Sequence, residues 1–432
     1  MKLEGGLETC VFWLPFFSSI YAVEQVMFFK LLHKGKGMNV KRDLPCEAVT
    51  SGPKHYFFGY YGICPWDLTG RYILCMESEF CDRPPNENDK LFIGFIDTEQ
   101  GNLFTKAAET TAWNFQQGCF LRWNPSNQRE EVVYNDRRDG DFISVILNIF
   151  NGQKRILPRP VYDISPDGSN GLSLNFARLN DTRPGYGYAG VEDRFKDEQF
   201  SDKDGIFAVD MKTGESKLII SYAQIAENFL ADEIAGRKLW FNHIMFNKNG
   251  SRFVFLARYS APKQPSGAFW LTSMFTANTD GSDIYCLSKN KDISHFDWYD
   301  NDRLAVWTER EKYGKKYYLI TDKTQYYEII GRKQLNEDGH GSYSPDGKWL
   351  LTDTYPDEKN YRSLILFNLR KEKKVDIGRF KDLRKVWGDN WDIRCDLHPR
   401  WNRDGTKICF DSVMDGSRQM YVSDVSELVE KY

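Results

Sequence analysis

The sequence predicts an all-β fold, a seven-bladed β-propeller with four-stranded antiparallel blades. Three observations carry this prediction. A strand–turn–strand pattern recurs seven times after residue 40, the copies are far enough apart to hold about four strands each, and helical periodicity is scarce. Runs rich in β-branched and aromatic residues are instead broken by Asp-Gly, Asn-Gly and Pro-Asp-Gly turns.

In each copy of the repeat a large apolar residue is followed four residues later by a turn former, and then by a strand. The apolar residues are Trp66, Trp123, Ile164, Phe246, Trp298, Tyr343 and Trp401, and the turn formers are Gly70, Asn127, Gly168, Gly250, Asp302, Gly347 and Gly405. Further hairpins, such as 91–104, 207–220 and 364–378, lie between the copies. The resulting units of ~40–50 residues with about four strands are typical of propeller blades.

The domain organisation follows from the spacing of the repeat. We expect residues 38–432 to form a single propeller, with an insertion near 179–205 in the long interval between the third and fourth copies. Because closing the ring needs a strand from across the termini, we expect residues ~40–60 to pair with the C-terminal blade.

Residues 1–37 are interpreted as a leader or non-native extension, disordered or membrane-associated. The apolar stretch 10–33 is interrupted by Pro15, Glu24 and Lys30, so a spanning helix is poorly supported. A basic n-region and a small-residue cleavage site are both missing, which disfavours a secretory signal.

Charge and cysteine content exclude several classes of function. With 58 Lys+Arg against 61 Asp+Glu and a net charge of −3, the chain has no basic footprint for nucleic acid. Apart from residues 1–37, no membrane contact is expected. The nine cysteines form no C-x-x-C pair and are most simply buried small hydrophobes, so neither a zinc module nor a disulfide framework is indicated.

Four of the six histidines fall at one register of the repeat, three residues before its large apolar residue. They are His243, His295, His340 and His398, whereas the first three copies carry Ile63, Phe120 and Val161 there. In a propeller this position opens the innermost strand, so we expect the four imidazoles to converge at the mouth of the axial channel. The alternative is a ring of histidines hydrogen-bonded to loop carbonyls.

A converging set of this kind is suited to bind a metal ion. Imidazole is the commonest transition-metal ligand, and Asp396, two residues before His398, adds a hard oxygen. The mixed set fits manganese, zinc or iron, with calcium also a candidate, and does not choose among them.

Two segments outside the repeat carry unusual side chains. Residues 52–62, GPKHYFFGYYG, place His55 and Tyr60 just before the first blade, on the same face as the histidines. The insertion begins with NFARLNDTRPGYGYAG, which concentrates four aromatic or cationic side chains on a glycine-rich loop: Arg178, Arg183, Tyr186 and Tyr188. Aromatic faces stack on pyranose rings and arginine binds carboxylates, so a sugar platform is one interpretation and packing of a long loop is the other.

Three further polar residues fall near the same mouth. Arg258 lies eight residues beyond Gly250, and Arg400 is close to His398, so both would add positive charge. Gln117, before the second blade, is either a hydrogen-bonding partner of a sugar or part of a satisfied loop.

Several of these motifs resemble known families. The Ser-Pro-Asp-Gly turns at 165–168 and 344–347 resemble the repeats of Tol-system translocation propellers. The segments HGSYSPDG (340–347) and DLHPRW (396–401) resemble the metal-binding strands of oligogalacturonate lyases, which are β-propeller polysaccharide lyases, although that family carries a histidine where this chain has Asp396. The segments 52–62 and 183–190 resemble the propeller lyases that release rhamnose from glucuronate.

The resemblance implies β-elimination on a uronate-containing oligosaccharide, in the bacterial cytoplasm or periplasm. It implies His243 as the base, His55 or Tyr60 as acid or alternative base, and Arg183 and Arg258 as carboxylate clamps. The implied ligands of the divalent metal are His295, His340, Asp396 and His398.

Two rival functions remain open at this point. Glycoside hydrolysis would need two flanking carboxylates, for which Asp136, Asp139 and Asp141 are candidates, although YNDRRDGDF reads more naturally as a hairpin. A non-catalytic propeller scaffold that binds protein or glycan on its top face is the other alternative.

Overall fold

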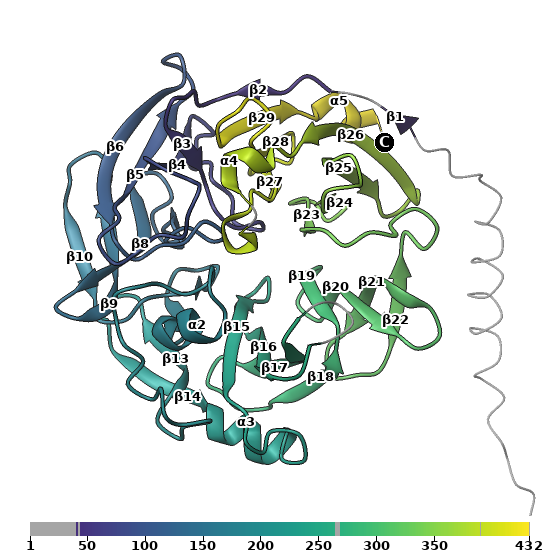
Figure 1. The fold of residues 1–432 in the computed structure, drawn as a ribbon. Coiled ribbons are helices and arrows are strands. Elements are labelled where there is room, and N and C mark those ends of the chain that lie inside the picture. Colours follow the sequence, from purple (N-terminus) through teal and green to yellow (C-terminus); the bar gives the residue numbers. More distant parts are fainter. Residues whose placement is uncertain (1–39, 42–43, 264–267, 389, 432) are drawn as a thin grey trace, which may run out of the picture. The chain divides into compact units, whose positions relative to one another are not determined.

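The computed structural model describes residues 40–41, 44–263, 268–388 and 390–431, so the expected leader, 1–37, lies outside the described residues. Within this part the strands form seven sheets arranged around one axis (Figure 1). The predicted seven-bladed, all-β propeller is therefore confirmed. None of the helices in the described ranges is long and apolar enough to cross a membrane.

The first four blades take their strands consecutively from the chain. Blade 1 contains β3 (His55–Phe57), β4 (Tyr72–Ser78), β5 (Leu91–Asp97) and β6 (Leu103–Thr110). Blade 2 contains β7 (Arg122–Trp123), β8 (Glu131–Arg138), β9 (Asp141–Asn148) and β10 (Lys154–Leu157). Blade 3 contains β11 (Asp163–Ile164), β12 (Asn170–Ser173), β13 (Gly205–Asp210) and β14 (Ser216–Ser221). Blade 4 contains β15 (Leu239–Phe246), β16 (Arg252–Ser260), β17 (Trp270–Asn278) and β18 (Tyr285–Lys291).

Blade 5 also takes its strands consecutively, whereas blades 6 and 7 each add a strand from the beginning of the described chain. Blade 5 contains β19 (Ile293–Trp298), β20 (Arg303–Arg310), β21 (Gly314–Thr321) and β22 (Tyr327–Ile330). Blade 6 contains β23 (Ser342–Tyr343), β24 (Trp349–Asp353), β25 (Tyr361–Asn368) and β26 (Lys373–Lys381), with β1 (Val40–Lys41) added in parallel to β26. Blade 7 contains β27 (Arg400–Trp401), β28 (Lys407–Ser412) and β29 (Gln419–Asp424), completed by β2 (Glu47–Ala48).

The ring is closed by β2, which pairs antiparallel with β29 through Glu47↔Val422 and Ala48↔Tyr421. This confirms the expected pairing of the early residues with the C-terminal blade. The parallel addition of β1 to blade 6 was not expected from the repeat, because a two-residue strand carries no recognisable pattern.

The helices are short and lie in the connections between strands. They are α2 (Phe176–Thr182), α3 (Tyr222–Phe229), α4 (Arg384–Trp387), the 3₁₀ turn η1 (Trp391–Ile393) and α5 (Ser426–Lys431). Asn175 caps α2 by accepting the backbone N–H of Arg178. The connection that contains α2 runs from β12 to β13 and includes the predicted insertion.

Apolar side chains fill the spaces between neighbouring blades. One cluster, for example, joins Val254 and Leu256 of blade 4 to Trp298 and Val306 of blade 5. Because each inner strand is held between two such layers, the side chains at its start take fixed positions.

The innermost strand of blade 1 is interrupted at its centre. Its ladder with β4 ends at Phe57↔Met76 and resumes only at the bridge between Trp66 and Ile73. The intervening segment, 58–65, leaves the sheet and carries Tyr60 and Tyr61, which are both buried.

We expect Gly59→Ala to destabilise the protein by about 1–3 kcal/mol, because Gly59 has a φ of +115° and lies against backbone. A Cβ atom there would lie 2.9 Å from the carbonyl oxygen of Gln117. Denaturant unfolding measures the change. Gly62→Ala is the matched control, since Gly62 also has a positive φ but nothing lies within 4 Å of its Cβ position; equal losses would show that the contact with Gln117 is unimportant.

Candidate active site

Four histidine side chains surround the tyrosine pair of the interrupted strand. They come from β15, from β19 and from the residues just before β23 and β27, that is, from blades 4 to 7. The ring-centroid distances to the nearer tyrosine are 5.3 Å for His243 to Tyr60, 5.7 Å for His295 to Tyr61, 5.3 Å for His340 to Tyr61 and 5.0 Å for His398 to Tyr60. The structure thus brings together the four imidazoles that share one register.

Irregular backbone at this register sets the direction of the side chains. Phe120, His243 and His398 have positive φ values of 55°, 51° and 42°. In blades 4 and 5 the ladder register also shifts beside His243 and His295. Such bulges interrupt the strict alternation of a strand and re-aim a side chain, here toward the propeller axis.

Three of the imidazoles have their Nδ1 atom engaged by an oxygen acceptor. His340 Nδ1 lies 2.9 Å from the Asp353 carboxylate, and His398 Nδ1 lies 2.9 Å from the carbonyl oxygen of Gly59. His295 Nδ1 lies 2.8 Å from the Asp338 carboxylate. Partners of this kind fix the ring orientation and leave Nε2 as the available nitrogen, as in metal-binding histidines.

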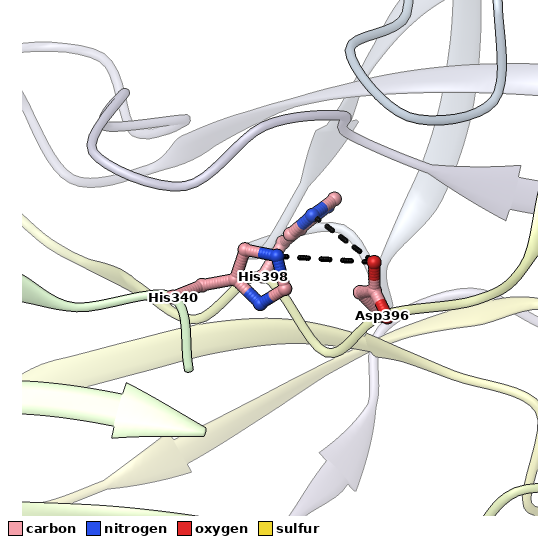
Figure 2. Close-up of side chains that lie close together, drawn as sticks. All are labelled: His340, Asp396 and His398. Atoms are coloured by element: carbon pink, nitrogen blue, oxygen red, sulfur yellow. Dashed lines mark ion pairs between the residues drawn. The ribbon is translucent and has the colours of Figure 1, made fainter. Parts of the chain in front are cut away.

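Two of these Nε2 atoms converge on one carboxylate. His340 Nε2 and His398 Nε2 each lie 3.8 Å from Asp396 Oδ2 (Figure 2). Ligand atoms of these three residues all lie within 4.8 Å of one another. Both Nε2 atoms are buried and have no hydrogen-bond partner, so the arrangement fits a divalent cation that would satisfy them. The ring of His295 lies 4.1 Å from that of His340, at the edge of the group.

Asp396 is held by two arginines that the repeat did not indicate. Arg394 Nε and Arg362 Nη1 lie 2.7 Å from its two oxygens. Burial alone would raise the pKa of Asp396, but Arg394 and Arg362 lower it below its ordinary value, so the carboxylate is ionised. Arg394 could have been identified from the sequence, because it alternates with Asp396 and His398 along one segment. No sequence pattern near Arg362 indicates its contact with Asp396.

His243 occupies a different environment, next to cations. Its Nδ1 lies 3.4 Å from the hydroxyl of Tyr162, and its ring stacks on Tyr60. Burial lowers the pKa of His243 well below its ordinary value, and the positive charges of Arg258 and Arg183 lower it further. His243 is therefore neutral at physiological pH, the form in which an imidazole accepts a proton.

Arg258 is a buried cation without an anionic partner. Its side chain is 6% exposed and donates from Nε to Thr272 Oγ1, but within the described ranges no carboxylate pairs with it. Burial and the neighbouring Arg183 lower its pKa to about 10. Arg183 itself pairs with Asp392 at 3.0 Å and lies over the ring of Tyr186.

Two other predicted residues lie beside this centre. The hydroxyl of Tyr186 accepts a hydrogen bond from Arg394, and its ring lies 5.5 Å from that of His243. Gln117 donates from Nε2 to the hydroxyl of Tyr162, so it contacts His243 only through that tyrosine. Tyr162 itself has no place in the sequence prediction.

Four of the candidate residues have contacts that hold the fold together, and their predicted roles stay predictions. All five N–H groups of the buried Arg178 bind acceptors: the Asp193 carboxylate and four backbone carbonyls. Tyr188 is fully buried, with its ring stacked 4.4 Å from that of Phe176.

The other two of these residues are Arg400 and His55. Arg400 donates four of its five N–H groups to Asp411 and to the carbonyl oxygens of Gly59 and Tyr60, so it braces the interrupted strand. His55 accepts the backbone N–H of Arg418 and contacts none of the other candidates among the described side chains.

Comparison with solved structures supports the fold. The chain is similar to an oligogalacturonate lyase in complex with manganese, with a TM-score of 0.65, 16% identity, and 92% of this chain and 99% of that chain covered. It is also similar to an oligogalacturonate lyase from Vibrio parahaemolyticus, with a TM-score of 0.61, 13% identity and coverages of 91% and 100%. A prolyl endopeptidase matches with a TM-score of 0.50, 11% identity and coverages of 88% and 49%.

No protein-family model and no curated protein matches the sequence. At these identities the structural neighbours establish the propeller architecture, which lyases and peptidases share, and leave the reaction to be argued from the site.

Proposed function

We propose that the chain is a metal-dependent lyase that cleaves uronate-containing oligosaccharides by β-elimination. The observation that carries the proposal is the buried, unpaired Arg258 beside a neutral His243. A buried cation without a partner is unfavourable in the free protein, and an anionic ligand relieves that cost. The carboxylate of a uronic acid is such an anion, and it places the weakly acidic C5–H bond near the imidazole.

The residues divide the reaction between them. Arg258 and Arg183 neutralise the carboxylate, which makes the C5 proton more acidic. His243 takes this proton, the C5–H electrons form the C4–C5 double bond, and the C4–O bond breaks. Tyr60 donates its phenolic proton to the leaving glycosidic oxygen; burial and the neighbouring Tyr61 raise the pKa of Tyr60 well above 10, so that proton is present.

A divalent metal bound at His295, His340, Asp396 and His398 would add positive charge at the substrate carboxylate. Because three of these four ligands are imidazoles, manganese or zinc suits the set better than calcium, which prefers oxygen ligands. The manganese named in the first structural neighbour supports this choice. The oligogalacturonate named there makes galacturonate oligomers the first substrates to try.

We expect the purified protein to form unsaturated product from uronate oligosaccharides, followed by its ultraviolet absorbance. We expect chelation to lower the rate at least tenfold, because it removes the positive charge of the metal ion from the substrate carboxylate. Added manganese or zinc is expected to restore the rate. We expect the His340→Asn variant to lose stoichiometric metal binding. Protein that is purified without bound metal and forms no product from any uronate, even with added manganese or zinc, would contradict the proposal and favour a non-catalytic scaffold.

A further inference from the structure

Trp391 is an exposed aromatic residue at the rim of the candidate active site. It is 48% exposed, and it is the only tryptophan among the strongly exposed large apolar side chains of the described residues. Its indole lies 5.9 Å from the guanidinium of Arg394, the residue that pairs with Asp396. Its neighbour Asp392 pairs with Arg183.

The Trp391 ring lies 6.1 Å from that of the buried Trp387, between centroids, and the rest of the ring is exposed. A single exposed aromatic side chain is common on protein surfaces, but one that lies beside a polar site offers a flat face to a ligand. A flat aromatic face beside a polar centre suits the C–H face of a pyranose ring, which packs on it while the hydroxyls remain in water.

A free cation lies next to the same ring. The guanidinium of Arg384, on α4, is 5.7 Å from the Trp391 ring and exposed. Among the residues that the structure describes, Arg384 has neither an ion-pair partner nor a hydrogen-bond partner on its side chain. Its five N–H donors are therefore available to a carboxylate.

We propose that Trp391 and Arg384 form a second sugar subsite that binds a second uronate next to the one being cleaved. The pyranose ring packs on the Trp391 indole and its carboxylate pairs with Arg384. This inference rests on the proposed function and deepens it: the substrate is an oligouronide with consecutive acidic units, and a neutral neighbouring sugar is bound less well.

The subsite is tested by measuring the binding of two disaccharides to the full chain by calorimetry. The His243→Asn substitution is used to prevent turnover. The probes are digalacturonate and galacturonosyl-rhamnose, which differ in the second sugar. We expect digalacturonate to bind about tenfold more tightly, a factor typical of one charge-assisted pair.

Variants separate the two contacts. Trp391→Ala weakens both probes about tenfold, whereas Arg384→Gln weakens digalacturonate alone and removes the preference. Lys385→Gln is the matched control, because Lys385 is an exposed cation on the same helix and does not contact Trp391. All three positions have exposed or rim side chains, and thermal unfolding confirms that each variant is folded.

The outcomes are distinguishable. Unchanged affinities in Trp391→Ala and Arg384→Gln, with both probes bound by the parent, overturn the subsite and leave the proposed function standing. A parent chain that binds neither probe overturns both. If Lys385→Gln weakens digalacturonate binding as much as Arg384→Gln does, the preference for digalacturonate comes from general surface charge. This result also overturns the subsite.

Discussion

His243→Asn is expected to lower kcat/KM for the elimination by about 10²–10⁴-fold, the usual contribution of general base catalysis. In the proposed mechanism the neutral imidazole beside Arg258 takes the C5 proton, and asparagine cannot accept it. Asparagine is the substitution of choice because residue 243 has a φ of 51°, a conformation that asparagine tolerates better than most residues. Initial rates of absorbance increase provide the measurement.

The same proposal fixes the sign of the pH dependence. A base must be unprotonated, so kcat/KM falls at pH values below the pKa of His243. Since burial and neighbouring arginines lower this pKa, the acidic limb lies below 6.5, the ordinary value for histidine. An acidic limb above that value, or a His243→Asn variant with the parent rate and unchanged metal content, would show that another group is the base.

Arg258→Gln is expected to have opposite effects on activity and stability. Loss of the proposed carboxylate clamp lowers kcat/KM by about 10²–10³-fold, as for a buried charge-assisted hydrogen bond. Removing a buried cation that has no anionic partner raises the free energy of unfolding by about 1–2 kcal/mol. Steady-state kinetics and denaturant unfolding measure the two effects on the same preparation.

The same strand provides a matched control for this variant. Arg252 also lies on β16, but it pairs with Asp322 at 2.8 Å and with Asp283 at 2.9 Å. Arg252→Gln therefore destabilises the protein, because it leaves the buried Asp322 carboxylate without its partner. If both substitutions destabilise equally, Arg258 is a structural residue and the carboxylate clamp must be sought elsewhere.

The fold could be predicted from the sequence because its signal is repeated. The step of four residues from an apolar side chain to a turn recurs seven times, so an error in one copy leaves the others intact. The same alignment placed His243, His295, His340 and His398 at one register, and the register alone implied their convergence. Positions that recur with the symmetry of the repeat can therefore be predicted from the sequence alone.

The loops could not be predicted in this way, because their contacts depend on segments distant in the sequence. Arg178 binds acceptors from 193–199 and Leu239, and Arg400 binds the carbonyls of Gly59 and Tyr60. A cation in a glycine-rich loop indicates a ligand site only if its hydrogen-bond donors are free. The Nδ1 partners Asp338 and Asp353 were missed for the same reason, since they lie outside the repeated register.

The closure by β1 and β2 has a consequence for when the proposed metal ligands come together. His340 and His398 belong to blades 6 and 7. A strand from the start of the described chain is added to blade 6 as its fifth strand, and another completes blade 7. During synthesis the amino-terminal residues emerge first and must wait for the last blade before they can pair. The cluster of His340, Asp396 and His398 therefore assembles late, when almost every residue has left the ribosome.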